Sequence, residues 1–374
     1  MAMADLMKDS LNLVAVEKMA ASLKAVWAQF DVDGFVTASM DGLEQLELKA
    51  RILHIITALH QHLPRDFIET ANILMAAGEK WQKGDENGSF SVFAIWPLID
   101  YVGVYGLDKP EKALDALEVL TPLFSAEFAI RPFINQHFEL TYQRLNQWVS
   151  HENEHVRRLV SEGIRPRLPW GLQLKQFIKN PTVVVELLEL LKDDEAEYVR
   201  RSVANNLNDI SKNHPELVVS ICNKWLKEAS KLEYKNRNWI ARHATRGLVK
   251  QGYPPVFSLL GYSENLDVEL RDLSLKKDHI KMGEALEFNF VLTANKPQKF
   301  VLDFAIHFMK ANGKLAAKTF KLKNIIMKNG ETLNIKKQQW FKPITTRKYH
   351  AGAHKLEILL NGRTFAEIHF LLEV

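Results

Sequence analysis

The fold of this chain is decided by a pattern that occurs three times near its middle: EHVRRLVSEGIRP (154–166), EYVRRSVANNLNDISK (197–212) and NWIARHATRGLVKQG (238–252). When Val156, Val199 and Ile240 are superposed, the copies lie 43 and 41 residues apart. A period of about 40–47 residues is typical of stacked helix pairs of the HEAT and armadillo type. The sequence therefore predicts a stack of helix pairs over residues 154–262.

Each copy is expected to be the second helix of its pair, because apolar segments that suit a first helix lie between the copies: PTVVVELLELLKDD (181–194) and ELVVSICNKWLKEAS (216–230). Stacking would place corresponding positions of successive second helices side by side on a concave face. The basic residues of the three copies would then form one track: Arg157, Arg158, Arg200, Arg201, Arg242 and Arg246. The alternative is that these arginines pair with acidic residues of neighbouring helices.

The chain upstream of the repeat is also predicted to be helical. From about Leu6 to Trp148 apolar residues recur at spacings of three and four, as in LKARILHIITALHQHL (48–63) and KALDALEVLTPLF (112–124). The segment KGDENGS (83–89) is predicted to be a loop between helices.

After Tyr262 the apolar residues recur at a spacing near two, which predicts strands. Seven candidate strands are separated by turn signals: residues 268–277, 285–294, 299–309, 318–327, 332–341, 354–361 and 364–374. Such a series fits an immunoglobulin-like sandwich that lacks the cysteine pair of antibody domains. The expected fold is mainly α plus all-β: a HEAT-like α-helical repeat solenoid over residues 1–262, followed by an immunoglobulin-like β-sandwich over residues 263–374.

The composition is that of a globular chain in a reducing compartment. Hydrophobic residues make up 47% and charged residues 25% of the 374 residues, which argues against a mostly disordered chain. The single cysteine, Cys222, excludes an intramolecular disulfide and a Cys-cluster zinc site. Lys8, Glu17 and Lys18 interrupt the apolar residues of the N-terminus, so no secretory leader is expected there. No stretch approaches the roughly 20 apolar residues of a membrane span, and we expect a cytoplasmic protein without a membrane partner.

The net charge of +4 is unevenly distributed. Residues 1–150 carry a net charge of −8, residues 151–262 carry +5, and residues 263–374 carry +7. A polyanion, if one binds, is therefore expected to meet the second half of the chain.

The passage SEGIRPRLPWG (161–171) is unusual for a repeat protein. Glu162 is followed by two arginines and two prolines, and the prolines stiffen the connection so that Trp170 can be presented at a defined place. In the next copy, Asp209 lies toward the end of its helix, where its charge opposes the helix dipole and suggests another use. The ordinary interpretations are a solvated glutamate and a core or capping tryptophan.

No cofactor or metal is predicted. His151 and His155 are four residues apart, a spacing that is compatible with metal ligation on one helix, but no third ligand is evident nearby. The sequence contains no Gly-rich phosphate loop and no Ser/His/Asp or Cys/His motif.

Several long strings resemble the AlkC-type DNA glycosylases, an alkylation-repair branch that is built on HEAT-like repeats and related to AlkD. They are LELKARILHIITALHQHLP (46–64), SAEFAIRPF (125–133), HVRRLVSEGIRPRLPWG (155–171) and VRRSVANNLNDISKNHPELV (199–218). The resemblance spans nearly the whole chain and includes the C-terminal immunoglobulin-like domain that one subgroup of the branch carries.

The resemblance implies that the chain excises bases methylated at N3, notably 3-methyladenine and 3-methylcytosine, from alkylated double-stranded DNA. By motif, Glu162 and Asp209 match the catalytic acids and Trp170 matches the aromatic residue that lies against the sugar of the lesion. Glu127 of SAEF matches a further acidic residue near the lesion. The expected DNA contacts are the arginine track together with Arg165, Arg167 and His243.

The chemistry of such a lesion suits these residue types. A cationic base leaves as a neutral molecule without a general acid, so the carboxylates would stabilise an oxocarbenium-like sugar and position a water molecule. The AlkC and AlkD branches are similar in holding a bent duplex without a closed base pocket, so base flipping is not expected. We expect a monomer that needs no metal.

The sequence leaves two alternatives open. A non-catalytic HEAT-repeat scaffold for protein partners would explain the repeat and the acidic N-terminal part, but it leaves the stiff RPRLPWG passage and the basic regions unexplained. A bent- or branched-DNA-binding protein without activity would not need both Glu162 and Asp209.

Overall fold

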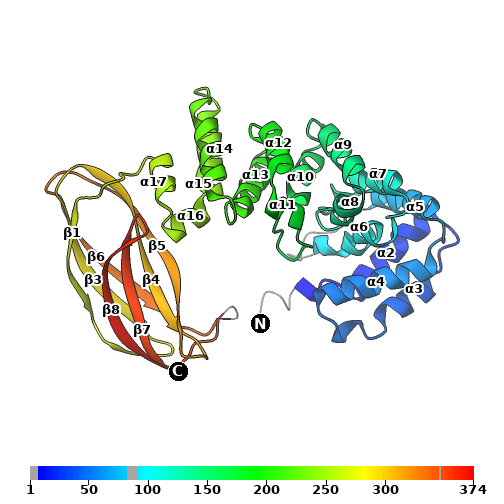
Figure 1. Ribbon diagram of the computed structural model, residues 1–374. Coiled ribbons are helices and arrows are strands. Elements are labelled where there is room, and N and C mark those ends of the chain that lie inside the picture. Colours follow the sequence, from blue (N-terminus) through cyan, green and yellow to red (C-terminus); the bar gives the residue numbers. More distant parts are fainter. Residues whose placement is uncertain (1–6, 82–90, 345–346) are drawn as a thin grey trace. The chain divides into compact units, whose positions relative to one another are not determined.

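The computed structural model describes residues 7–81, 91–344 and 347–374 (Figure 1). The described chain forms two compact units, one that ends at Asn213 and one that begins at His214. The loop predicted at residues 83–89 lies outside the described residues. A helical region is followed by a β-sandwich, which confirms the predicted fold class.

The first unit is built of helices that follow one another along the chain (Figure 1, blue to green). They are α2 (Leu13–Val26), α3 (Val32–Met40), α4 (Leu48–His62), α5 (Phe67–Lys80), α6 (Trp96–Tyr105), α7 (Pro110–Leu120), α8 (Arg131–Gln136), α9 (Phe138–Trp148), α10 (Glu154–Gly163), α11 (Lys175–Lys179), α12 (Thr182–Leu191) and α13 (Glu197–Ile210), with short 3₁₀ turns at Leu43–Gln45 and Ser91–Ile95.

Helices α10 and α13 carry the first two copies of the repeat and pack directly on each other. Each buries one apolar stripe, which in α10 contains Val156, Leu159 and Val160. The Asn153 side chain begins α10 by accepting a hydrogen bond from the backbone of His155 at 2.9 Å. This packing sets the ends of the two helices beside each other, where the candidate acids lie.

The third copy of the repeat differs from the prediction of one continuous helix. It is divided into α15 (Tyr234–Ala244) and α16 (Arg246–Gln251) at Thr245, whose hydroxyl donates to the Ala241 carbonyl at 2.7 Å. A threonine hydroxyl that bonds back into the preceding turn competes with helix hydrogen bonding and often bends a helix.

The second unit contains α14 (Pro215–Lys227), α15, α16, α17 (Pro254–Leu259) and two sheets. The strands are β1 (Val268–Leu275), β2 (His279–Lys281), β3 (Ala285–Ala294), β4 (Gln298–Met309), β5 (Leu315–Met327), β6 (Thr332–Trp340), β7 (Gly352–Leu360) and β8 (Arg363–Glu373). The strand order is β1-β3-β6 in one sheet and β2-β8-β7-β4-β5 in the other. All seven predicted strands are present, and the three-residue β2 was missed because its pattern is too short to show a period.

The turn after α16 lies directly against the turn between β7 and β8, where two glycines meet. Gly252 and Gly362 both have left-handed backbones, with φ values of +70° and +71°. A Cβ atom on Gly362 would lie 2.1 Å from the Cα of Gly252, so neither position has room for a side chain. On the same side, Val301 of β4 packs with Leu248 and other apolar residues of α16 and α17. The domain boundary at residue 262 stays a prediction, while residues 214–262 pack in one unit with the sandwich.

Candidate active site

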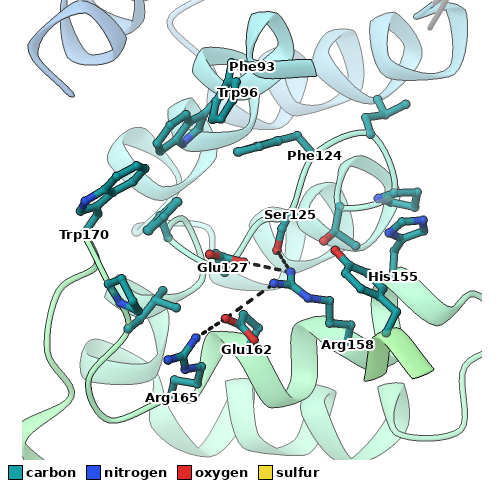
Figure 2. Close-up of a pocket in the computed structure, with 17 residues that line it drawn as sticks. Phe93, Trp96, Phe124, Ser125, Glu127, His155, Arg158, Glu162, Arg165 and Trp170 are labelled. Atoms are coloured by element: carbon teal, nitrogen blue, oxygen red, sulfur yellow. Dashed lines mark hydrogen bonds and ion pairs between the residues drawn. The ribbon is translucent and has the colours of Figure 1, made fainter. Parts of the chain in front are cut away.

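A cavity of about 470 Å³ lies in the first unit, between the segment before α8 and the loop after α10 (Figure 2). One side is aromatic and the other is charged. The lining residues are Phe93, Trp96, Thr121, Pro122, Leu123, Phe124, Ser125, Glu127, Phe128, His155, Arg158, Glu162, Arg165, Leu168, Pro169, Trp170 and Tyr198. Three residues predicted for the site, Glu127, Glu162 and Trp170, therefore meet around one space.

Glu162 stands near the end of α10 and is 4% exposed. Its carboxylate accepts hydrogen bonds from Arg165 Nη1 at 2.6 Å and from Ser202 Oγ at 2.6 Å, and Ser202 belongs to α13. Burial acts to raise the pKa of Glu162, but the guanidinium groups of Arg158 and Arg165 outweigh it and hold the pKa below its usual value. Glu162 is therefore a buried carboxylate that stays ionised at neutral pH.

Arg158 lies between the two carboxylates of the cavity (Figure 2). Its guanidinium donates to Glu127 Oε2 at 2.9 Å and to Ser125 Oγ at 2.7 Å, and Nη2 is 3.6 Å from Glu162 Oε1. Its Cζ atom lies 4.7 Å from the ring centroid of Tyr198. Burial raises the pKa of Glu127 above its usual value, and the charge of Glu162 adds to this rise against the opposing effect of Arg158.

Asp209 is 2% exposed and does not line the cavity. Its Oδ2 accepts a hydrogen bond from Arg165 Nε at 2.9 Å, and its Oδ1 accepts one from Lys212 Nζ at 2.8 Å. Arg165 thus bridges Asp209 on α13 and Glu162 on α10. Asp209 is therefore linked to the cavity only indirectly, by its hydrogen bond with Arg165, which does line the cavity.

Trp170 stands at the rim of the cavity and is 59% exposed. Its backbone is left-handed, with a φ of 61°, which is disfavoured for a bulky side chain. Lys49 Nζ of α4 donates a hydrogen bond to the Trp170 carbonyl. The predicted rigid presentation of Trp170 therefore depends on contacts outside the loop as well as on its prolines.

Comparisons with known proteins agree on one family. Residues 269–374 match the family described as uncharacterised protein YhaZ, C-terminal Ig-like domain. The uncharacterized protein YhaZ of Bacillus subtilis (strain 168) is 36% identical over 369 residues, which cover 98% of this chain and 99% of that protein. The structure of Pseudomonas fluorescens alkylpurine DNA glycosylase AlkC, bound to DNA containing an abasic site analog, is 37% identical with a TM-score of 0.90 and covers 98% of this chain and 99% of that chain. The chain belongs to the AlkC family.

The remaining basic residues predicted for DNA lie in different settings in this AlkC-family chain. Arg157 is buried and donates to both oxygens of Asp194, at 2.7 and 3.0 Å. Arg200 donates to the carbonyls of Asp194 and Glu195, whereas the exposed Arg201 pairs with Glu197 at 2.5 Å. Arg157 and Arg201 thus form ion pairs within the protein, and the DNA role of all three arginines stays a prediction.

Four other residues were predicted to contact DNA: Arg167, Arg242, His243 and Arg246. Arg167 donates to Asn213 Oδ1 at 3.0 and 3.2 Å on an exposed surface. Arg242, His243 and Arg246 belong to the second unit, where Arg242 donates to the Leu260 carbonyl at 3.2 Å and His243 stacks on Trp239 with the ring centroids 4.9 Å apart. The single track predicted across all three copies stays a prediction.

The sequence did not single out Arg131, a fully buried residue at the start of α8. Its guanidinium donates to the carbonyls of Gly163, Arg165 and Leu172 at 2.7, 2.8 and 2.5 Å, and so fixes the loop that carries the site. Burial lowers the pKa of Arg131 to about 10. The string SAEFAIRPF contains it, but its partners lie 32 to 41 residues away, where spacing gives no signal.

Among the described residues, no group of three or more His, Cys, Asp and Glu side chains is arranged to hold a metal ion. His155 lines the cavity, while His151 Nε2 lies 3.5 Å from Glu118 Oε1. Within the same described ranges, no helix has the length and apolar character needed to cross a membrane.

Proposed function

We propose that this AlkC-family chain is a monofunctional DNA glycosylase that releases N3-methylated cationic bases, 3-methyladenine and 3-methylcytosine, from alkylated duplex DNA. The observation that carries the proposal is the buried, ionised carboxylate of Glu162 beside Glu127 and Trp170 in one cavity. The relative of known structure supports it, because it is an alkylpurine DNA glycosylase bound to DNA with an abasic site analog.

The proposed reaction breaks the bond between C1′ and the base nitrogen. Both electrons of that bond go to the cationic base, which leaves as a neutral molecule, and the sugar becomes oxocarbenium-like. A water oxygen then bonds to C1′ and its proton leaves to solvent. Glu162 would stabilise the positive sugar and orient the water, because its charge is already fixed by Arg165 and Ser202 before the lesion arrives.

Trp170 and Glu127 would act on the other sides of the lesion. The indole face of Trp170 would lie against the partly positive C–H groups of the sugar. Glu127 would place a second acid near the leaving base. The damaged nucleotide would stay within a bent duplex, as the family resemblance implies, and would not rotate into a closed pocket.

Asp209 would contribute through Arg165 and would be a positioning residue. Its carboxylate holds Arg165 Nε at 2.9 Å, and Arg165 in turn holds Glu162. Replacement of Asp209 would free the guanidinium to move, and the charge and orientation of Glu162 would change with it.

The grip on DNA is proposed to come from exposed basic residues. Among the arginines predicted for DNA in the first unit, we propose Arg167 and Arg201 because both reach solvent. A phosphate contact fixes the register of a duplex without reading its sequence. Arg201→Ala is expected to weaken DNA binding and to reduce the slope of log affinity against log salt by about one. Arg157→Ala is the comparison, because its guanidinium is already bound to Asp194.

The proposal is tested by incubating the purified protein with methylated duplex DNA and identifying the released bases by mass spectrometry. We expect 3-methyladenine and 3-methylcytosine to appear with wild type, in buffer that contains a chelator. Glu162→Gln and Asp209→Asn should bind an abasic-site duplex as wild type does and release little base. If wild type frees no methylated base, the enzyme proposal fails.

The same experiment separates the two alternatives. A bent- or branched-DNA-binding protein without activity would bind the abasic-site duplex and release no base. A HEAT-repeat scaffold for protein partners would do neither.

A further inference from the structure

Lys49 holds a position that neither the repeat nor the acids explain. It lies near the start of α4, and its ammonium group donates to the backbone carbonyl of Trp170, which is 121 residues away in the sequence. The same ammonium lies 4.7 Å from the ring centroid of Phe128, a residue that lines the cavity. Lys49 therefore joins α4 to two residues of the cavity wall.

The hydrogen bond of Lys49 meets the chain at a residue with an unusual backbone conformation. The backbone of Trp170 is left-handed, a conformation that costs free energy in a bulky residue and persists only where surrounding contacts hold it. The adjacent hydrogen bond, from Gly171 N to the Leu168 carbonyl at 3.1 Å, closes the turn but does not join it to another helix. The Lys49 contact does.

The ammonium group of Lys49 lies near a carboxylate and near aromatic residues of the cavity wall. Asp100 of α6 lies close enough to oppose the lowering effect of burial on the pKa of Lys49. The Asp100 carboxylate accepts a hydrogen bond from Trp96 Nε1 at 2.8 Å, and Trp96 stacks on Phe128 with the ring centroids 5.1 Å apart. Lys49 thus sits between the rim residue Trp170 and the aromatic wall.

We infer that Lys49 is a positioning residue that fixes the indole of Trp170 at the rim of the cavity through the Trp170 carbonyl. The inference rests on the proposed function for its catalytic consequence, but the contact itself can be tested without activity. Without the ammonium donor, the Trp170 turn loses its link to α4 and the indole samples other orientations.

The first readout needs no substrate. The full chain is labelled with 5-fluorotryptophan, which gives fluorine NMR signals for its eight tryptophans, and the Trp170 signal is identified from its loss in Trp170→Phe. Lys49→Met keeps the aliphatic stem and removes the donor, so we expect the Trp170 signal to shift or broaden. Lys49→Arg keeps a charged donor and should restore the wild-type signal at least in part.

Lys18→Met is the matched control. Its ammonium also lies 4.7 Å from the ring centroid of a tryptophan, Trp81, but Trp81 does not line the cavity. This control should leave the Trp170 signal unchanged. A Trp170 signal that is the same in wild type and in a folded Lys49→Met would overturn the inference.

The second readout is the single-turnover rate of base release. Lys49→Met should slow release by about 10–100-fold, as a small displacement of a positioned group does, and should have no further effect when Trp170→Ala is already present. Full additivity of the two substitutions would overturn the inference. If Lys49→Met instead lowers DNA affinity and its salt dependence while the Trp170 signal stays fixed, Lys49 is a phosphate contact and the inference is wrong.

Failure of the proposed function would look different. Wild type would then release no base, while Lys49→Met would still move the Trp170 signal, and the positioning contact would stand. If Lys49→Met does not fold, Lys49→Ala gives the decision, because it also removes the donor: a changed Trp170 signal in a folded Lys49→Ala supports the inference, and a signal like that of wild type overturns it.

Discussion

Replacement of Arg131 by methionine is expected to destabilise the first unit by about 1.5–6 kcal/mol, a range that follows from its contacts. The guanidinium donates to the carbonyls of Gly163, Arg165 and Leu172, and each bond to a charged donor contributes about 1.5–3 kcal/mol. Burial of the charge offsets part of this total, because the fall of the Arg131 pKa from its usual value to about 10 corresponds to about 3 kcal/mol. The difference is the expected loss.

The measurement is urea unfolding of the full chain, followed by far-ultraviolet circular dichroism, which reports the helices. The transition midpoint of Arg131→Met should fall well below that of wild type. Arg201→Met is the control, because the Arg201–Glu197 pair is more than half exposed on both sides and should contribute less than about 1 kcal/mol. If Arg131→Met costs less than about 1 kcal/mol, the three carbonyls do not depend on this arginine and the reasoning is refuted.

Three further predictions concern other parts of the molecule. Glu162→Gln should reduce base release by about 100-fold or more with unchanged affinity for abasic-site DNA, measured by single-turnover kinetics and anisotropy, and an unchanged rate would contradict its role. Gly362→Ala should lower the thermal midpoint of the second unit, because a Cβ there meets Gly252 at 2.1 Å, while Gly313→Ala, which has open space and a similar φ of +74°, should cost only about 1 kcal/mol. Burial raises the pKa of Asp100 from 3.8 to about 7, so its ionisation destabilises the fold progressively as pH rises from about 4 to about 7. Asp100→Asn should therefore gain stability relative to wild type as pH rises from about 4 to about 7, by at most about 4 kcal/mol, and a difference that does not vary with pH would contradict this.

The architecture could be predicted from the sequence because periodic patterns determine it. The copies aligned on Val156 and Val199 became the packed helices α10 and α13, since an apolar stripe at helical spacing leaves few other ways to bury itself. The break at Thr245 could not be predicted, because its hydroxyl can bond within a helix or interrupt one and only the surrounding packing decides.

The site was predictable only in part. Glu162 and Trp170 stand in one short string, so their proximity follows from the local chain. Lys49 and Arg131 could not be found in this way, because each donates to backbone carbonyls of a distant loop. Every residue has such a carbonyl, so the residue types do not indicate which one accepts the bond. The place of Asp209 behind Arg165 likewise depends on side-chain geometry that spacing does not contain.

The left-handed backbone of Trp170 has a consequence for efforts to improve this protein. Glycine adopts that conformation freely, so a selection for heat resistance or expression alone would favour Trp170→Gly and discard the indole. Libraries that are ranked by yield would then become enriched in chains that fold well but lack the indole that is proposed to lie against the sugar of the lesion. Variants of the RPRLPWG loop should be scored on DNA from the first round of selection.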